Sequence, residues 1–292
     1  MSIKTAGMGS MAMSNDLTSI LVHLDDDADG CARRLHTAQR LAAAQGARLD
    51  TLYAVTPSVL QNPYAFTVET GAASLLIGAE AAQRERARNV FEQARTRAGG
   101  LPEVSWHEAR GEPVGAFVRR GWASDLLVLG QHDPDAAPSG APPDFATSVL
   151  VDSGKPALVL PYVDTGAAVG DTVLVAWKPT RESARAVTAA LPLLRRARQV
   201  HLIAWDEAED SDTRTPLEIE AFLQHHDITA TLHRGVRPSA GLGEMLLSQA
   251  ADLQADLLVM GCYGHGRARE WVLGGVTRTV LRSMTLPVLM VH

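Results

Sequence analysis

One sequence pattern occurs twice in the chain, and this repeat limits the folds that the chain can adopt. The segment Ser-Asp-Leu-Leu-Val-Leu-Gly at residues 124–130 returns almost unchanged as Ala-Asp-Leu-Leu-Val-Met-Gly at residues 255–261. A second matching pair, around Pro156 and Pro287, has the same offset of 131 residues as the first. Chance similarity would not keep this register, so the repeat indicates two copies of one structural unit.

Each copy alternates short apolar runs with helical patterns. The expected strands are residues 19–24, 48–55, 104–109, 125–130 and 155–160, then 172–177, 199–205, 229–233, 255–261 and 285–291. The expected helices are residues 29–45, 79–98, 113–122 and 145–152, then 180–194, 216–226 and 239–253, with a long connection over 56–78. Strands this continuously apolar are typical of a parallel sheet covered on both sides. The predicted fold class is α/β, with two tandem doubly wound, Rossmann-like domains that each have a five-stranded parallel sheet.

The repeat also predicts the domain organisation. Residues 1–16 are rich in Met, Ser and Gly, and we expect a disordered tail there. The first domain is predicted over 17–161, a polar linker over 162–170, and the second domain over 171–292. We expect the strands at 157–160 and 288–291 to pair or pack around a pseudo-two-fold axis within the chain, with a homodimer as a further level of assembly.

Composition excludes several classes of function. The net charge of −6 argues against a nucleic-acid surface, which needs clustered Lys and Arg. The sequence has no run of 18 apolar residues and no signal-peptide pattern, so we expect a cytoplasmic protein without a membrane span. The two cysteines, Cys31 and Cys262, lie far apart and predict buried free thiols rather than a disulfide or metal motif.

A glycine-rich stretch follows the repeated strand in the second copy only. Five glycines lie within fifteen residues: Gly261, Gly264, Gly266, Gly274 and Gly275. A glycine turn that leaves a parallel strand exposes backbone N–H groups to anionic oxygen, and a following helix N-terminus adds a favourable dipole. The stretch therefore predicts a phosphate site, although glycines that only permit a tight turn are the alternative.

These residues resemble the universal stress protein family in its tandem, two-domain form. Nucleotide-binding members carry G-x2-G-x9-G-[ST], and Gly261, Gly264 and Gly274 have this spacing. The resemblance implies an adenine nucleotide alpha-hydrolase-like fold that binds ATP, ADP or AMP, with or without Mg²⁺, in the second domain. The site residues that it implies are Trp177, Lys178, Trp205, Met260, Gly261, Gly264, Gly266, Gly274, Gly275, Val276 and Thr277.

The sequence departs from the family pattern in both copies. In the second, Gly275 stands where the family has Ser or Thr, and Lys178 replaces the Asp that usually ends the first strand. In the first, Asp25 keeps that acidic position, but Gly130 is followed by Gln-His-Asp and four prolines instead of a glycine loop. We therefore expect at most a degenerate site at Asp25 and Gly130. Because residues 25–29 directly precede a helix, a helix-capping role for Asp25 is favoured over a ligand contact.

The other candidate residues have structural alternatives. Trp177 and Trp205 either stack on the adenine or are core residues near the rim of the sheet. Cys262 with His265 lacks further ligands at metal spacing, and His225 and His226 suit a helix C-terminus. The acidic residues 207–212 are either a solvated loop or a lid.

No catalytic motif stands out in the sequence, so an enzyme is not predicted beyond slow ATP hydrolysis. The leading hypothesis is a stress-response regulator that binds an adenine nucleotide and acts on an unidentified regulatory protein. The alternatives are a structural or interaction module that has lost nucleotide binding and, from the enzyme class, an adenylate-handling enzyme.

Overall fold

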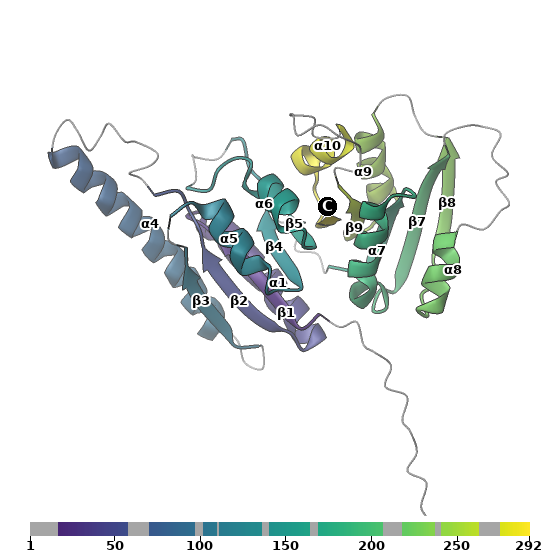
Figure 1. The fold of residues 1–292 in the computed structure, drawn as a ribbon, viewed down its shortest axis with the longest axis horizontal. Coiled ribbons are helices and arrows are strands. Elements are labelled where there is room, and N and C mark those ends of the chain that lie inside the picture. Colours follow the sequence, from purple (N-terminus) through teal and green to yellow (C-terminus); the bar gives the residue numbers. More distant parts are fainter. Residues whose placement is uncertain are drawn as a thin grey trace, which may run out of the picture.

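The computed structural model describes residues 17–57, 70–96, 102–109, 111–135, 140–163, 169–206, 218–236, 241–262 and 275–292 (Figure 1). The first half contains β1 (Ser19–Leu24), α1 (Ala28–Gln45), β2 (Arg48–Tyr53), α4 (Thr70–Thr96), β3 (Val104–Glu108), α5 (Pro113–Gly121), β4 (Leu126–Gly130), α6 (Phe145–Ser153) and β5 (Ala157–Leu160). The second half contains β6 (Thr172–Trp177), α7 (Arg181–Leu194), β7 (Gln199–Asp206), α8 (Glu218–His225), β8 (Thr231–Val236), α9 (Leu242–Asp252), β9 (Leu257–Gly261), α10 (Gly275–Ser283) and β10 (Val288–Val291).

The strands of the two halves form one continuous sheet. Its order is β3-β2-β1-β4-β5-β10-β9-β6-β7-β8, so each half has the same internal order and the halves meet at β5 and β10. All neighbours are parallel except β5 and β10, which pair antiparallel with Val159 opposite Val288. The predicted pairing of residues 157–160 with 288–291 is confirmed. Because the direction of the strands reverses at this seam, the carboxyl ends of the strands in the two halves lie at opposite edges of the sheet.

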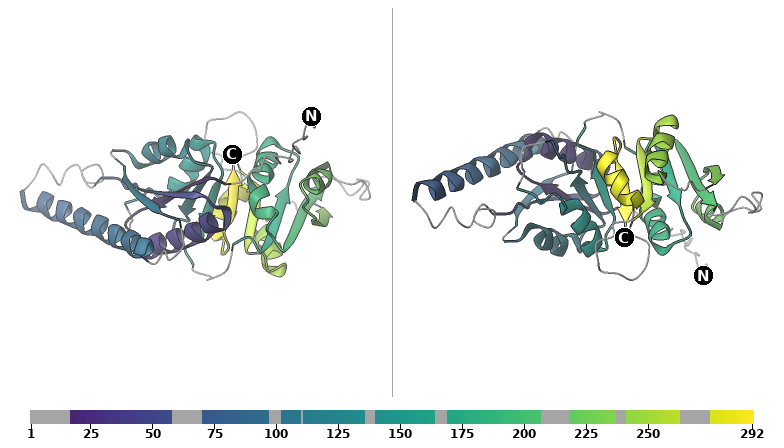
Figure 2. Two further views of the ribbon diagram at one scale, coloured as in Figure 1. Left: turned by 90° about the horizontal axis from the view of Figure 1, so that it is seen from below. Right: turned by 90° about the horizontal axis from the view of Figure 1, so that it is seen from above.

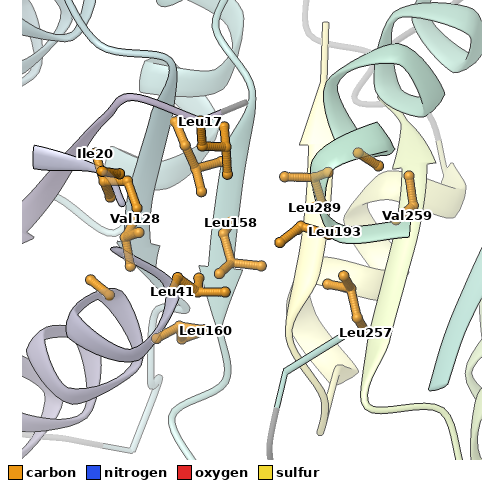
Figure 3. Close-up of a cluster of buried hydrophobic side chains, with 14 of the residues drawn as sticks. Leu17, Ile20, Leu41, Val128, Leu158, Leu160, Leu193, Leu257, Val259 and Leu289 are labelled. Atoms are coloured by element: carbon orange, nitrogen blue, oxygen red, sulfur yellow. The ribbon is translucent and has the colours of Figure 1, made fainter. Parts of the chain in front are cut away.

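Helices cover both faces of the sheet (Figure 2). One buried cluster joins the sheet to α1, α4, α7 and α8, and the other joins it to α5, α6, α9 and α10. Figure 3 shows the first cluster at the seam, where Leu158 of β5 and Leu289 of β10 are register partners. A strand buried on both faces needs apolar side chains at every position, which explains the continuous apolar runs in the sequence.

Several predicted elements have other bounds in the structure; the strand expected over 285–291, for example, spans Val288–Val291. The helix expected over 79–98 begins earlier, at Thr70, since the alanine, leucine and isoleucine of its first turns outweigh the cost of Gly71 and Gly78. This part of α4 extends away from the sheet, and Leu75 and Ile77 are exposed (Figure 1). The strand expected to end at residue 233 continues to Val236, because its pairing with β7 runs on to Asp206.

The cap of α1 is Asp27 and not Asp25. The Asp27 side chain accepts a hydrogen bond from Gly30 N at 3.0 Å, while Asp25 has the different partners described below. In the second half, Thr180 caps α7 in the same way by accepting from Ser183 N. No helix of the described residues is long and apolar enough to span a membrane.

An aspartate at the same position in each half accepts hydrogen bonds from the backbone at the start of the first strand of that half. Asp125 accepts hydrogen bonds from the backbone N–H groups of Thr18 and Ser19, each at 3.0 Å. Asp256, at the corresponding position, accepts from Gly170 N at 2.8 Å and Asp171 N at 3.1 Å. The Asp of the duplicated sequence segment therefore stabilises the start of β1 or β6 from the neighbouring strand.

We expect Asp256→Ala to lower the free energy of unfolding by about 1–3 kcal/mol, because it leaves backbone N–H groups at residues 170–172 without their acceptor. Urea denaturation followed by circular dichroism measures this change. Asp152→Ala, at an exposed position on α6, is the control and should change stability by less than about 0.5 kcal/mol. Equal stability of the two variants would contradict the anchoring role.

Candidate functional site

The candidate site lies at the carboxyl edge of β6 and β9. Ala176 of β6 and Met260 of β9 are register partners, so Trp177 and Lys178 come to the same edge as Gly261. This is the edge at which open α/β sheets bind ligands. The glycine stretch predicted from sequence starts there, but Gly264, Gly266 and Gly274 lie outside the described residues.

Gly261 is required by the close approach of α7. A Cβ atom at this position would lie 2.5 Å from Ser183 N and 2.7 Å from the backbone carbon of Glu182. The Ser183 hydroxyl links the same turn to β6, since it accepts from Lys178 N at 3.3 Å and donates to Ala176 O at 3.4 Å. The N-terminus of a 14-residue helix is thereby held directly against the start of the glycine stretch.

The second border of the candidate site is the start of α10. Gly275 is the first residue of this helix and is exposed, and a Cβ atom there would meet nothing within 4 Å. Val276 is partly buried, and Thr277, in the first turn, is buried at 4% exposure. Met260, buried at 5% exposure, packs in the cluster of α9 and α10. The structure thus places Val276 and Thr277 in the helix turn that follows the glycine stretch.

The two tryptophans lie on opposite faces of the sheet. Trp177 is the register partner of Ala204, so Trp205, one residue later, points to the other face. Trp177 packs with the cluster of α7 and α8, whereas Trp205 packs with the cluster of α9 and α10. A single adenine therefore cannot stack on both.

The sequence reasoning missed Glu182. This residue is in the first turn of α7, is 5% exposed and lies beside Gly261. Burial opposes its ionisation, but the hydrogen bond and charge of Arg181, together with hydrogen bonds from its own backbone N–H and from Thr180, lower the pKa of Glu182. Burial, together with the nearby negative charge of Glu182, raises the pKa of the Cys262 thiol to about 12, so this thiol stays protonated. The sequence offered one signal for Glu182, because a residue two positions after the capping Thr180 lies in the first turn of the helix.

In the first half, the corresponding edge is filled by the side chain of Arg34. Its Nη2 donates to Asp25 Oδ1 at 2.7 Å, and its Nε donates to His23 O at 2.8 Å. Its Nη1 lies where a Cβ atom on Gly130 would be. The position of Arg34, seven residues after the helix cap, is taken by Val187 in α7. The guanidinium of Arg34 thus fills the carboxyl edge of the first half beside Gly130. The second half has no guanidinium at this position.

Aromatic packing covers the same edge of the first half. His23 stacks on Phe145 with ring centroids 3.9 Å apart, and its Nε2 is 2.9 Å from Ala54 O. Burial lowers the pKa of His23 to about 4, so the ring is neutral. The second half has Ala176 in the place of His23 and Trp205 in the place of Ala54.

The chain after β4 folds back over this edge. Gly140 N donates to Asp26 Oδ1 at 2.9 Å, and Gly140 O accepts from Thr56 N at 2.7 Å. Gln131, which follows Gly130, instead links the two halves, because its side chain donates to Leu281 O and accepts from Tyr162 N. Gln131 and Gly140, which lie in the segment that replaces the glycine stretch in the first half, therefore have structural partners.

The buried Asp25–Arg34 pair gives a prediction for stability. Burial alone would raise the pKa of Asp25, but the charge and hydrogen bond of Arg34, together with His23 and the backbone N–H of Asp27, outweigh burial and lower that pKa. Arg34→Met removes the cation and should lower the free energy of unfolding at pH 7 by about 3–5 kcal/mol, because Asp25 is left buried and unpaired. The double variant Asp25→Asn with Arg34→Met should recover most of this loss.

The loss should also depend on pH. The lowered pKa of Asp25 makes the pair stabilising above the pKa of the unfolded chain, and this contribution is lost as pH falls. In Arg34→Met burial raises the pKa of Asp25, so protonation in mild acid relieves the unpaired charge. Urea denaturation should show that the difference in free energy of unfolding between Arg34→Met and the parent is smaller at pH 5 than at pH 7. A difference in free energy of unfolding that is the same at both pH values and unaffected by Asp25→Asn would contradict this role of the pair.

Comparison with known proteins shows the family. The model of the universal stress protein family matches residues 17–161 and again residues 170–292. The crystal structure of a universal stress protein from Archaeoglobus fulgidus DSM 4304 is similar, with 16% identity and a TM-score of 0.67, and the match covers 94% of this chain and 97% of that one. A protein of unknown function from Pseudomonas aeruginosa PAO1 matches with 17% identity and a TM-score of 0.61 over 94% of this chain and 92% of that one.

At these identities the solved structures show a shared fold. The search of curated proteins gave no match. The family model, which matches each half separately, confirms the resemblance found in the sequence. The chain belongs to the universal stress protein family, in its tandem, two-domain form.

Proposed function

We propose that the second half binds an adenine nucleotide at the carboxyl edge of β6 and β9, and that this binding serves a regulatory role in a stress response. The observation that carries the proposal is the difference between the two edges. In the first half Arg34 occupies the space beside Gly130, whereas in the second half Val187 replaces it and the N-terminus of α7 lies against Gly261. The second edge therefore combines the glycine stretch of the sequence with the backbone N–H groups of the first turn of α7, which suit a phosphate.

Lys178 and the N-terminus of α7 suit a nucleotide phosphate, whereas the Glu182 carboxylate beside Gly261, which is paired with Arg181, opposes an anion. Lys178 brings a cation to the end of β6, and the N-terminus of α7 adds a positive dipole. Thr277, in the first turn of α10, has a hydroxyl near the position where the family has Ser or Thr. Lys178 cannot accept a hydrogen bond from a ribose hydroxyl, so we expect the phosphates to supply more of the affinity than the ribose.

Mg²⁺ would enter this site with the phosphates of ATP. Among the residues that the structure describes, no group of three or more His, Cys, Asp or Glu side chains is arranged to hold a metal ion. Mg²⁺ usually keeps several waters and few protein ligands in nucleotide sites, so the donor set is compatible with that mode of binding.

Calorimetric titration with ATP, ADP and AMP, with and without Mg²⁺, tests the proposal. We expect one nucleotide per chain, since Arg34 occupies the space beside Gly130 in the first half. The melting temperature should rise with nucleotide concentration, because the ligand binds the folded state. No heat and no change in melting temperature at millimolar nucleotide would favour a structural or interaction module without nucleotide. Release of ADP during the titration would favour slow hydrolysis.

Substitutions at two glycines test the position of the site. Gly261→Ala should weaken nucleotide binding at least tenfold, because the added Cβ forces β9 and the first turn of α7 apart. Gly275→Ala is the matched control and should change affinity less than twofold, since its Cβ enters open space. Gly275→Ser should tighten binding, because it places a hydroxyl at the helix start. If Gly261→Ala is folded by circular dichroism and binds like the parent, the nucleotide lies elsewhere.

A further inference from the structure

Two histidines face each other across β7 and β8 in the second half. His201 Nδ1 lies 3.0 Å from His233 Nε2, and the ring centroids are 5.2 Å apart at an interplanar angle of 46°. Both side chains are partly buried, and β8 is the edge strand of the sheet (Figure 1). His201 lies four residues before Trp205, roughly 13 Å along the strand, so the pair is separate from the proposed nucleotide site.

The first half has a different pair at the same positions. Register places Asp50 where the second half has His201, and His107 where it has His233. Asp50 accepts hydrogen bonds from the Ser105 hydroxyl and from Arg48, and lies 3.6 Å from His107 Nε2. The acidic partner is thus fully engaged in the first half, whereas the second half brings two imidazoles together.

The geometry points to a divalent metal site. We propose that His201 and His233 bind a transition metal ion of the Zn²⁺ type through Nδ1 and Nε2. Two nitrogens that lie 2.0–2.1 Å from one metal ion are about 2.9–3.4 Å apart at ligand angles of 90–110°, and the observed separation falls in this interval. Within the described residues no third His, Cys, Asp or Glu completes the site, so water or an external ligand fills the other positions.

Metal binding requires a change of tautomer in one ring of the pair. In the metal-free pair one nitrogen donates its proton to the other. When metal binds, that proton moves to the other nitrogen of the donating ring, and both facing nitrogens present lone pairs to the ion.

Titration calorimetry with Zn²⁺ alone, on the full chain, tests the site. We expect His201→Gln and His233→Gln each to lower the affinity of one site at least tenfold, because each leaves a single imidazole. His225→Gln is the control, since His225 is an exposed histidine at the end of α8, and it should leave that affinity unchanged. The metal-free melting temperature of each variant checks folding.

A Zn²⁺ site that survives both substitutions, or the absence of any measurable Zn²⁺ binding by the parent, would overturn the proposal. The spectrum of bound Co²⁺ gives a second readout that does not depend on affinity. Its visible absorption bands should shift in His233→Gln and stay unchanged in His225→Gln. Identical spectra for all three proteins would place the metal elsewhere.

Discussion

The antiparallel pairing of β5 with β10 is the interaction on which the architecture depends. It joins two parallel half-sheets into one sheet, and Leu158 and Leu289 continue the buried cluster across the seam. Gln131 adds a hydrogen bond from the end of β4 to α10 of the other half. Because the strand direction reverses at the seam, the carboxyl edges of the two half-sheets face away from each other. Each edge can therefore change without altering the other, and the two edges have diverged.

The divergence follows from a few side chains. Asp25 and Arg34 form a buried pair whose guanidinium closes the edge beside Gly130, and His23 and Phe145 stack over it. In the second half Lys178 and Val187 take the positions of Asp25 and Arg34. A buried ion pair contributes little net stability compared with apolar packing, but a break in it is costly. The first half is thus held in a closed form, while the second keeps backbone N–H groups near its glycine stretch.

Much of the fold could be predicted from the sequence, because apolar runs and the repeat report directly on buried strands. The site was less predictable, because tertiary contacts determine the partners of its side chains and the faces on which they lie. Asp25 was expected to cap α1, but Asp27 does so, and the partner of Asp25 is Arg34, which only the packing of α1 on the sheet brings close. Trp177 and Trp205 were assigned to one site, yet the register of β6 with β7 sends them to opposite faces. Glu182 was overlooked because its burial depends on how closely α7 approaches Gly261.

We propose that the second half holds the nucleotide and the first half does not. A crystal structure of the chain grown with a non-hydrolysable ATP analogue tests it most directly. We predict nucleotide density at the carboxyl edge of β6 and β9, with phosphates near Gly261 and the N-terminus of α7, and an unchanged Asp25–Arg34 pair in the first half. Nucleotide density beside Asp25 and Gly130, with Arg34 displaced, would contradict the account.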